Sequence, residues 1–202
     1  MKQFSRYGIL FVVSAPSGAG KTTLIEALRR TPNVSYSVSC TTRAPRMGEI
    51  DGQDYQFLSE DDFRARVKAG DFLEHAQVHG DSYGTLRQPV VTNLKKGIDV
   101  LIDIDTQGAA SIRSCDDPFI REALTDVFIM PPDLDELRRR LLKRGTETEE
   151  QIERRLKTGA REMERWREYR YTIISKSMEE DFQKFRSIMS AESYLSRRLI
   201  QK

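Results

Sequence analysis

The chain of 202 residues is long enough for one α/β domain with elaborations and too short for two large independent domains. Its 33 basic and 31 acidic side chains nearly cancel, and no apolar run is long enough to span a bilayer, so composition indicates neither a nucleic-acid nor a membrane partner. Two cysteines, Cys40 and Cys115, provide no disulfide framework, and we therefore expect reduced thiols in a cytoplasmic protein.

The first predicted elements are a buried strand, a glycine-rich turn and a helix. Gly8–Ser14 is a nearly continuous apolar run with β-branched residues, which is typical of a strand buried on both faces. A helical stretch follows from Lys21 to Arg30 and stops before Pro32. This order predicts the opening of a parallel α/β sheet.

The turn between strand and helix has the pattern of a phosphate-binding loop. It reads A-P-S-G-A-G-K-T and matches G-x-x-x-x-G-K-[ST], except that Ala15 stands where the first glycine is usual. Small residues let backbone N–H groups curl around phosphates, while Lys21 neutralises the β/γ oxygens and the Thr22 hydroxyl reaches Mg²⁺. The pattern predicts a nucleoside triphosphate site made of Ala15, Pro16, Ser17, Gly18, Ala19, Gly20, Lys21, Thr22 and Thr23.

The pattern of residues changes between Tyr36 and about Pro89, where we expect a small inserted subdomain. A strand-like stretch at 35–42 leads into a loop rich in glycine, proline and arginine. Arg43 and Arg46, three apart on this loop, can hold one phosphate with forked, charge-assisted hydrogen bonds. A short helix is then predicted between an N-cap at Ser59 and a stop at Gly70.

The second half of the chain returns to strands and then becomes helical. Strands are predicted at Val100–Asp105 and Val127–Met130, and the period of two places Asp103 and Asp105 on one strand face, looking into one crevice. Helix-start signals follow at Asp133 with Glu136 and at Thr148 with Gln151. We expect these two helices, joined at Gly145, to form a mobile lid, followed by a strand at 171–175 and a polar helix from about 179.

Taken together, these motifs resemble the guanylate kinase family. The string S-x-T-T-R-x-P-R-x-G-E-x-x-G-x-D-Y-x-F, which begins at Ser39, is similar to the family's GMP-phosphate site. Further similar segments, spread over nearly the whole chain, are the phosphate loop, Phe72–Glu74, Tyr83–Thr85, Asp103–Gly108 and Arg144–Thr148.

The resemblance implies a fold and a reaction. The fold is α/β, a P-loop parallel sheet flanked by helices, with a core at about 1–35, 90–132 and 163–202, a GMP-binding subdomain at about 36–89 and a lid at about 133–162. The reaction is the Mg²⁺-dependent transfer of the γ-phosphoryl group of ATP to GMP. No catalytic base is expected, because the attacking phosphate oxygen of GMP is already ionised at neutral pH.

The resemblance also implies roles for the residues at matching positions. The GMP phosphate would be held by Ser39, Arg43, Arg46, Tyr55 and Tyr83. Guanine would be read by Glu74 and Thr85 with help from Asp105. Mg²⁺ would be organised by Thr22 and, through water, by Asp103. Catalytic charge would come from Lys21, Arg43, Arg140, Arg144 and Arg155.

One segment departs from the family pattern, and two alternative functions stay open at this point. The family commonly has Asn-Asp-Asp near the donor adenine, whereas this chain reads Ser175-Lys176-Ser177, which predicts weak discrimination at the donor base. The alternatives are a catalytically silent, phosphopeptide-binding scaffold of the same fold and a monophosphate kinase with another acceptor. The retained Lys21, Thr22 and lid arginines disfavour the scaffold.

Overall fold

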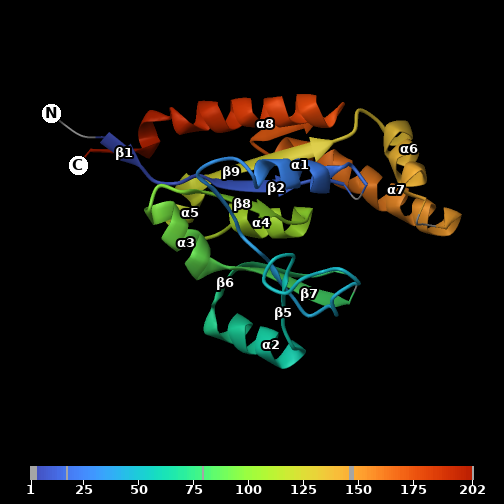
Figure 1. The fold of residues 1–202 in the computed structure, drawn as a ribbon, viewed down its shortest axis with the longest axis horizontal. Coiled ribbons are helices and arrows are strands. Elements are labelled where there is room, and N and C mark those ends of the chain that lie inside the picture. Colours follow the sequence, from blue (N-terminus) through green and yellow to red (C-terminus); the bar gives the residue numbers. More distant parts are fainter. Residues whose placement is uncertain (1–3, 17, 79, 146–147, 202) are drawn as a thin grey trace.

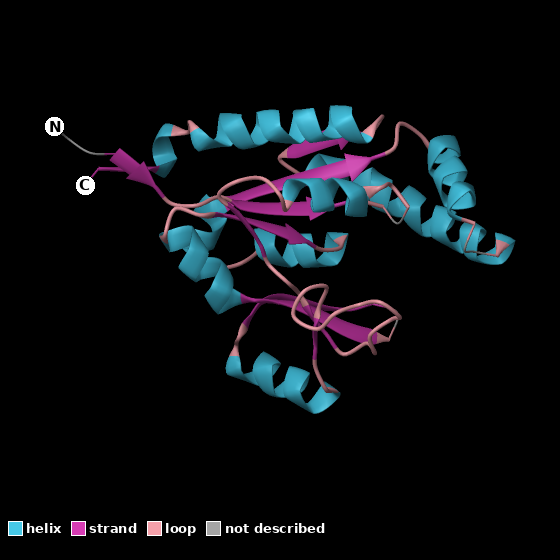
Figure 2. Cartoon of the chain, in the orientation of Figure 1, coloured by secondary structure: helices cyan, strands magenta, loops and turns pink. Residues whose placement is uncertain are grey.

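A five-stranded parallel sheet forms the centre of the protein (Figures 1 and 2). The computed structural model describes residues 4–16, 18–78, 80–145 and 148–201. The strand order is β10-β9-β2-β8-β3, and all four pairings are parallel. These strands are β2 (Leu10–Ser14), β3 (Val34–Tyr36), β8 (Asp99–Asp103), β9 (Leu124–Met130) and β10 (Tyr171–Ile174). The predicted α/β class with a parallel core is therefore confirmed.

Helices cover both faces of this sheet, and the strands are apolar on both faces for that reason. Along the first central strand, Phe11 and Val13 pack toward α1 (Lys21–Leu28) and α8 (Met178–Ser193). Their neighbours Leu10 and Val12 pack on the opposite side. That side is covered by α3 (Arg87–Lys95), α4 (Thr106–Arg113) and α5 (Pro118–Ala123).

A second, four-stranded sheet lies beside the central one and has its own small core (Figure 1). Its order is β5-β4-β7-β6, and Phe63 and Phe72 stack beneath it. The strands are β4 (Cys40–Thr41), β5 (Gln56–Phe57), β6 (Phe72–Val78) and β7 (Asp81–Leu86). Helix α2 (Glu60–Ala69) starts at the predicted N-cap Ser59 and ends at the predicted Gly70.

Two helices pack against each other at the end of the molecule that lies opposite the termini in Figure 1. They are α6 (Leu134–Arg144) and α7 (Glu149–Met163), joined by a core of Leu137, Leu141 and Ile152. Asp133 caps α6, and Thr148 forms a capping box with Gln151, as predicted. A short 3₁₀ helix, η1 (Glu164–Glu168), leads from α7 back to the central sheet.

The two ends of the chain meet in an antiparallel ribbon that the sequence did not indicate. It consists of β1 (Phe4–Arg6) and β11 (Leu199–Gln201), which follows the 3₁₀ turn η2 (Ser196–Arg198). Arg6 fastens the ribbon to the central sheet with two hydrogen bonds to the Asp99 carboxylate, at 2.6 and 2.9 Å.

Several predicted strands are too long: β2 starts only at Leu10, and the stretch at 35–42 divides into β3 and β4, which belong to different sheets. The strand predicted at Val100–Asp105 also ends early, and the reason bears on the site. The strand β8 ends at Asp103, because Asp105 leaves the strand to become the N-cap of α4. Asp103 and Asp105 therefore do not share a strand face, although both still line one cavity. Within the described residues, no helix is both long and apolar enough to cross a membrane.

Candidate active site

A cavity of about 670 Å³ lies at the carboxyl ends of β2 and β8, where ligands of open α/β sheets gather. The second sheet and α7 complete its wall. Predicted site residues from segments far apart in the chain line it together: Lys21, Thr22, Ser39, Tyr55, Glu74, Tyr83, Asp103 and Asp105.

The phosphate loop joins β2 to α1 and turns on two glycines. Gly18 and Gly20 have φ angles of +94° and +95°, a region that glycine adopts without steric penalty. Position 15 does not require a glycine, because Ala15 does not have a positive φ. In the part of the chain described, Asn33 is the one non-glycine residue that does. Ser17 lies outside the described residues, so the prediction for it stays a prediction.

Lys21 begins α1 and reaches the end of the neighbouring strand. Its ammonium group pairs with the Asp103 carboxylate and also donates a 3.3 Å hydrogen bond to the carbonyl of Ile104. Thr22 lines the same cavity as Asp103. Among the described side chains, no group of three or more His, Cys, Asp and Glu could by itself hold a metal ion. Mg²⁺ commonly uses one or two carboxylates plus substrate phosphates, and Thr22 and Asp103 fit such a donor set.

The two predicted phosphate-binding arginines are linked by one carboxylate. Glu49 accepts hydrogen bonds from the Arg43 guanidinium at 2.9 and 3.0 Å and from the Arg46 backbone at 2.7 Å. The hydrogen bonds from Arg43 hold the pKa of Glu49 below its usual value. Arg43 also lies 5.4 Å from the ring centre of Tyr55, whose ring makes an edge-type contact with that of Tyr83. The loop thus presents cationic and aromatic groups beside the cavity.

Glu74 is a buried carboxylate on β6 whose side chain reaches the cavity. It is 6% exposed, and its Oε1 accepts a 2.7 Å hydrogen bond from the Thr85 hydroxyl. Burial raises the pKa of Glu74 to about 7; the Thr85 hydrogen bond opposes this shift and the charge of Asp105 adds to it. Thr85 itself is fully buried behind Glu74 and does not line the cavity.

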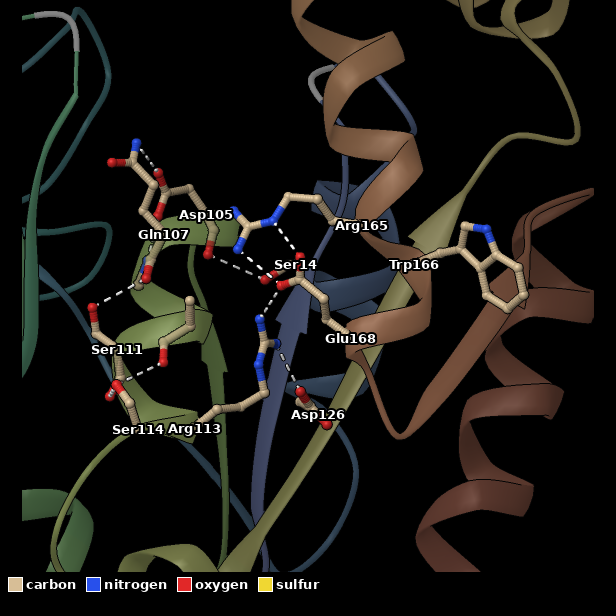
Figure 3. A network of polar contacts seen from close by, with 12 residues as sticks. Ser14, Asp105, Gln107, Ser111, Arg113, Ser114, Asp126, Arg165, Trp166 and Glu168 are labelled. Carbon is tan, nitrogen blue, oxygen red and sulfur yellow. Dashed lines mark hydrogen bonds and ion pairs between the residues drawn. The ribbon is translucent and has the colours of Figure 1, made fainter.

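Asp105, which lines the same cavity as Glu74, lies at the start of α4 (Figure 3). Its carboxylate caps the helix by accepting a 2.8 Å hydrogen bond from the backbone of Gly108 and a 3.3 Å hydrogen bond from Gln107. Its carbonyl accepts a 3.3 Å hydrogen bond from Ser14, which fixes this turn against β2. The helix start therefore holds Asp105 at the cavity wall.

An ionic network ties η1, which follows α7, to α4 (Figure 3). Arg113 on α4 donates to Asp126 at 2.9 Å and to Glu168 at 2.7 Å. Glu168 on η1 also accepts two 2.9 Å hydrogen bonds from Arg165, and these hold its pKa below the usual value. The network anchors the segment through which the α6–α7 pair joins the core.

The predicted lid arginines lie in different surroundings. On α7, Arg155 shares the helical face of Thr158 and Glu162, which line the cavity, because the spacings are three and seven residues. Arg144 is the last residue of α6, and nothing is described of its side chain. Thr146 and Glu147 of the same motif lie outside the described residues.

Arg140 is enclosed by protein acceptors. It donates to Glu136 at 2.7 Å, to the phosphate-loop carbonyl of Ala19 at 2.6 Å and to the Ser175 hydroxyl at 2.9 Å. Weaker contacts reach the carbonyls of Ser175 and Lys176 at 3.3 and 3.4 Å. In this conformation Arg140 ties α6 to the phosphate loop and to the segment before α8.

A second cavity, of about 520 Å³, adjoins the other side of the phosphate loop. Lys143, Ser175, Lys176 and Asp181 contribute to its wall. The Ser175 hydroxyl donates a 2.6 Å hydrogen bond to buried Asp181 while accepting from Arg140, so its one donor hydrogen and one of its two acceptor lone pairs are used within the protein.

Several cavity residues were not identified from the sequence. They are Tyr36, Ala76, Gln77, Val78, Gly84, Ile104, Gln107, Thr158 and Glu162. Most sit beside predicted residues on the same strand or helix, so period-two and i, i+3 spacing from Glu74 and Arg155 was the available signal.

Comparisons with known proteins agree on one family. The family model described as "Guanylate kinase" matches residues 7–192. The guanylate kinase of Protochlamydia amoebophila is 46% identical over 187 residues, which span 92% of this chain and 91% of the relative. That of Clostridium tetani is 42% identical over 185 residues, spanning 92% and 86%. The crystal structure of guanylate kinase from Anaplasma phagocytophilum matches with a TM-score of 0.79 at 34% identity, covering 98% and 93% of the two chains.

Proposed function

This chain belongs to the guanylate kinase family and phosphorylates GMP with ATP, and we propose that the reaction takes place in the 670 Å³ cavity. One observation carries the assignment of the site. A single cavity is lined by the P-loop lysine Lys21, by Asp103 at the end of a strand and by the buried acid Glu74 of the second sheet. A donor phosphate, a metal and an acceptor base have their partners within it.

GMP would bind between the second sheet and α4. Its phosphate would meet Ser39, Arg43, Arg46, Tyr55 and Tyr83, which supply hydroxyl and guanidinium donors. Guanine offers two adjacent donors, N1–H and the 2-amino group, and the Glu74 carboxylate can accept from both. Asp105 provides further acceptor oxygens, and Thr85 acts by orienting Glu74.

Mg²⁺, when bound with ATP, would be held by the Thr22 hydroxyl and, through water, by Asp103. It supplies positive charge against the phosphate oxygens and helps to align donor and acceptor. Lys21, which pairs with Asp103 in this structure, would turn its charge to the β/γ oxygens when they are present.

The chemistry requires charge compensation rather than a base. Two nucleotides bring together several negative charges, about −1.5 to −2 for each terminal phosphate, and the acceptor oxygen is already ionised. Lys21, Arg43, Arg144 and Arg155 would offset this charge, while Arg140 would hold α6 against the phosphate loop. The donor base would enter the 520 Å³ cavity beside Ser175.

Three larger parts would cooperate: the core, the second sheet as GMP-binding subdomain at about 36–89, and α6–α7 as lid at about 133–162. Their closure would align the nucleotides and exclude water. Both cysteines are free thiols, which supports action in the cytoplasm. No finding supports the scaffold or a different acceptor.

The site assignment is tested with one pair of variants. We expect Arg43→Met to raise KM for GMP at least ~10-fold, because a charged hydrogen-bond donor to phosphate is lost. KM for ATP should stay unchanged. Arg64→Met, on the exposed face of α2, is the matched control. Equal GMP kinetics in the two variants would remove the loop from the GMP site. ADP production with GMP, AMP, CMP or UMP measures the choice of acceptor.

A further inference from the structure

The first turn of α4 approaches β6 at a glycine. A β-carbon built on Gly108 would lie 2.7 Å from Oε2 of Glu74 and 3.2 Å from the Cδ1 atom of Ile104. The first distance is far inside van der Waals contact, so any side chain at position 108 must displace the Glu74 carboxylate. The absence of a β-carbon provides the space in which this carboxylate lies.

Apart from these two contacts, of which the one with Glu74 is the closer, no local requirement accounts for a glycine at this position. Gly108 is not among the glycines with positive φ, so its backbone is open to any residue. Its N–H donates the capping hydrogen bond to Asp105, which every residue except proline can do. Within a helix, alanine is favoured over glycine because glycine loses more backbone entropy.

The other side of the carboxylate is equally fixed. Thr85 donates to Oε1 from a fully buried position on β7, and Glu74 is itself 6% exposed. Glu74 therefore lies between a hydroxyl of the second sheet and a bare helix turn of the core. The orientation of its two oxygens depends on contacts from both parts.

We propose that Gly108 is a specificity-determining positioning residue for the acceptor base. It acts through Glu74, whose two oxygens must lie in the plane of guanine's N1–H and 2-amino donors to accept from both. The inference rests on the proposed function, in which Glu74 reads guanine. Gly108 itself contacts no substrate in this account.

The test is Gly108→Ala, with Ala110→Ser as the matched control, since it adds one atom to the same helix away from Glu74. We expect Gly108→Ala to raise KM for GMP at least ~10-fold, as for loss of one hydrogen bond to a charged group. KM for ATP and kcat at saturating GMP should remain within about twofold, because ground-state binding of the base is what changes. The melting temperature should change little, because the helix preference of alanine offsets part of the cost of the crowded contact. The control should match the parent chain in all four quantities.

A second substitution, at Glu74, distinguishes a steric clash with the Glu74 carboxylate from a general loss of structure in Gly108→Ala. Glu74→Asp withdraws the carboxylate by one methylene group, and adding Gly108→Ala to it should change KM for GMP by less than about twofold. Additive effects of the two changes, a lower melting temperature with both KM values raised, or an unchanged KM for GMP would each overturn the proposal. If Gly108→Ala fails to fold, recovery of folding in the Glu74→Asp background supports it and failure there overturns it.

The proposed function fails by a different result. If Glu74→Ala leaves KM for GMP unchanged, Glu74 does not read guanine, whatever Gly108→Ala does. If Glu74→Ala weakens GMP and Gly108→Ala does not, the site assignment holds and only the role of Gly108 is lost.

Discussion

At the scale of single residues, Glu74 links burial to the pH dependence of GMP use. Its pKa of about 7 means that a large share of the free enzyme carries the neutral acid near neutral pH. The neutral acid has one hydroxyl that donates, so it cannot accept from both guanine donors. We expect kcat/KM for GMP to fall as the pH drops below about 7 and to level off above it, because this ratio reports groups of the free enzyme.

The phosphate of GMP also titrates, with a second pKa of about 6, and a matched variant separates the two effects. Glu74→Gln removes the titration of the enzyme group and leaves that of the substrate. The variant should therefore lose the step near 7 and keep only the lower one. If the pH profiles of kcat/KM for the parent chain and for Glu74→Gln differ only by a constant factor, the whole pH dependence belongs to the substrate.

Lys21 offers a second test at this scale. Lys21→Met keeps the bulk of the stem, removes the charge meant for the β/γ oxygens and leaves Asp103 without its ion-pair partner. We expect kcat to fall at least ~10²-fold, comparable to removing one transition-state donor. Lys68→Met, on exposed α2, is the control. Near-normal turnover in a folded Lys21→Met protein would exclude the phosphate loop from the catalytic account.

Single residues also show what the sequence could and could not predict about the site. Lys21 and Glu74 were identifiable because their motifs are local strings of letters. The importance of the missing β-carbon at Gly108 depends on an approach between β6 and α4, and no local pattern encodes such a distance. The same holds for Ser175, whose partner Asp181 becomes visible only in the folded chain.

At the scale of elements, helix starts were predicted best, because a cap is a contact between residues three apart. Ser59 accepts from Asp62, Asp133 from Glu136 and Thr148 from Gln151. Pairing between distant segments was not predictable in the same way. The ribbon of β1 and β11 joins the two ends of the chain, and neither strand of three residues has a periodic pattern of its own.

The segment before α8 carries a prediction about the donor base. Because the Ser175 hydroxyl gives its hydrogen to Asp181 and accepts from Arg140, it has no donor and at most one acceptor lone pair left for an incoming adenine in this conformation. We expect GTP to replace ATP at a cost of about 1–2 kcal/mol, one hydrogen bond's worth, when kcat/KM is compared at saturating GMP. Ser175→Ala should leave the ATP-to-GTP ratio nearly unchanged. A preference for ATP beyond ~10³-fold, on the order of three such bonds, would show that this segment or another one reads the base.

At the scale of the whole molecule, a buried ionic cluster holds the C-terminal segment against the central sheet. Glu192 on α8 accepts hydrogen bonds from Arg198 at 2.7 Å, from Tyr171 at 2.8 Å and from Thr125 at 3.0 Å. Arg198 also donates to the carbonyl of Ala123 at 3.1 Å. The two charged residues are buried: Glu192 is 1% exposed and Arg198 is 4% exposed. The cluster fastens the C-terminal segment, and with it the β1–β11 ribbon, to the end of the central sheet that lies away from the cavity.

The cluster predicts how stability should depend on pH. Burial alone would raise the pKa of Glu192, but the hydrogen bonds from Arg198, Tyr171 and Thr125 outweigh it and hold this pKa below the usual value. A depressed folded-state pKa contributes stability that is present above the unfolded value of about 4.3 and is lost as the pH falls through the folded value. Arg198→Met should therefore lower the free energy of unfolding at neutral pH by about 3 kcal/mol, the lower end for a broken buried pair, since Arg170 still contacts Glu192.

The deficit of Arg198→Met should narrow as the pH falls below about 4.3, because protonated Glu192 no longer requires a cation. Urea unfolding of both chains between neutral and acidic pH measures the difference directly. Arg197→Met, an exposed neighbour, is the control and should match the parent at every pH. A deficit of constant size across the range would mean that Arg198 stabilises the fold through packing and its hydrogen bonds to neutral acceptors such as the Ala123 carbonyl, and that its charge on Glu192 contributes nothing.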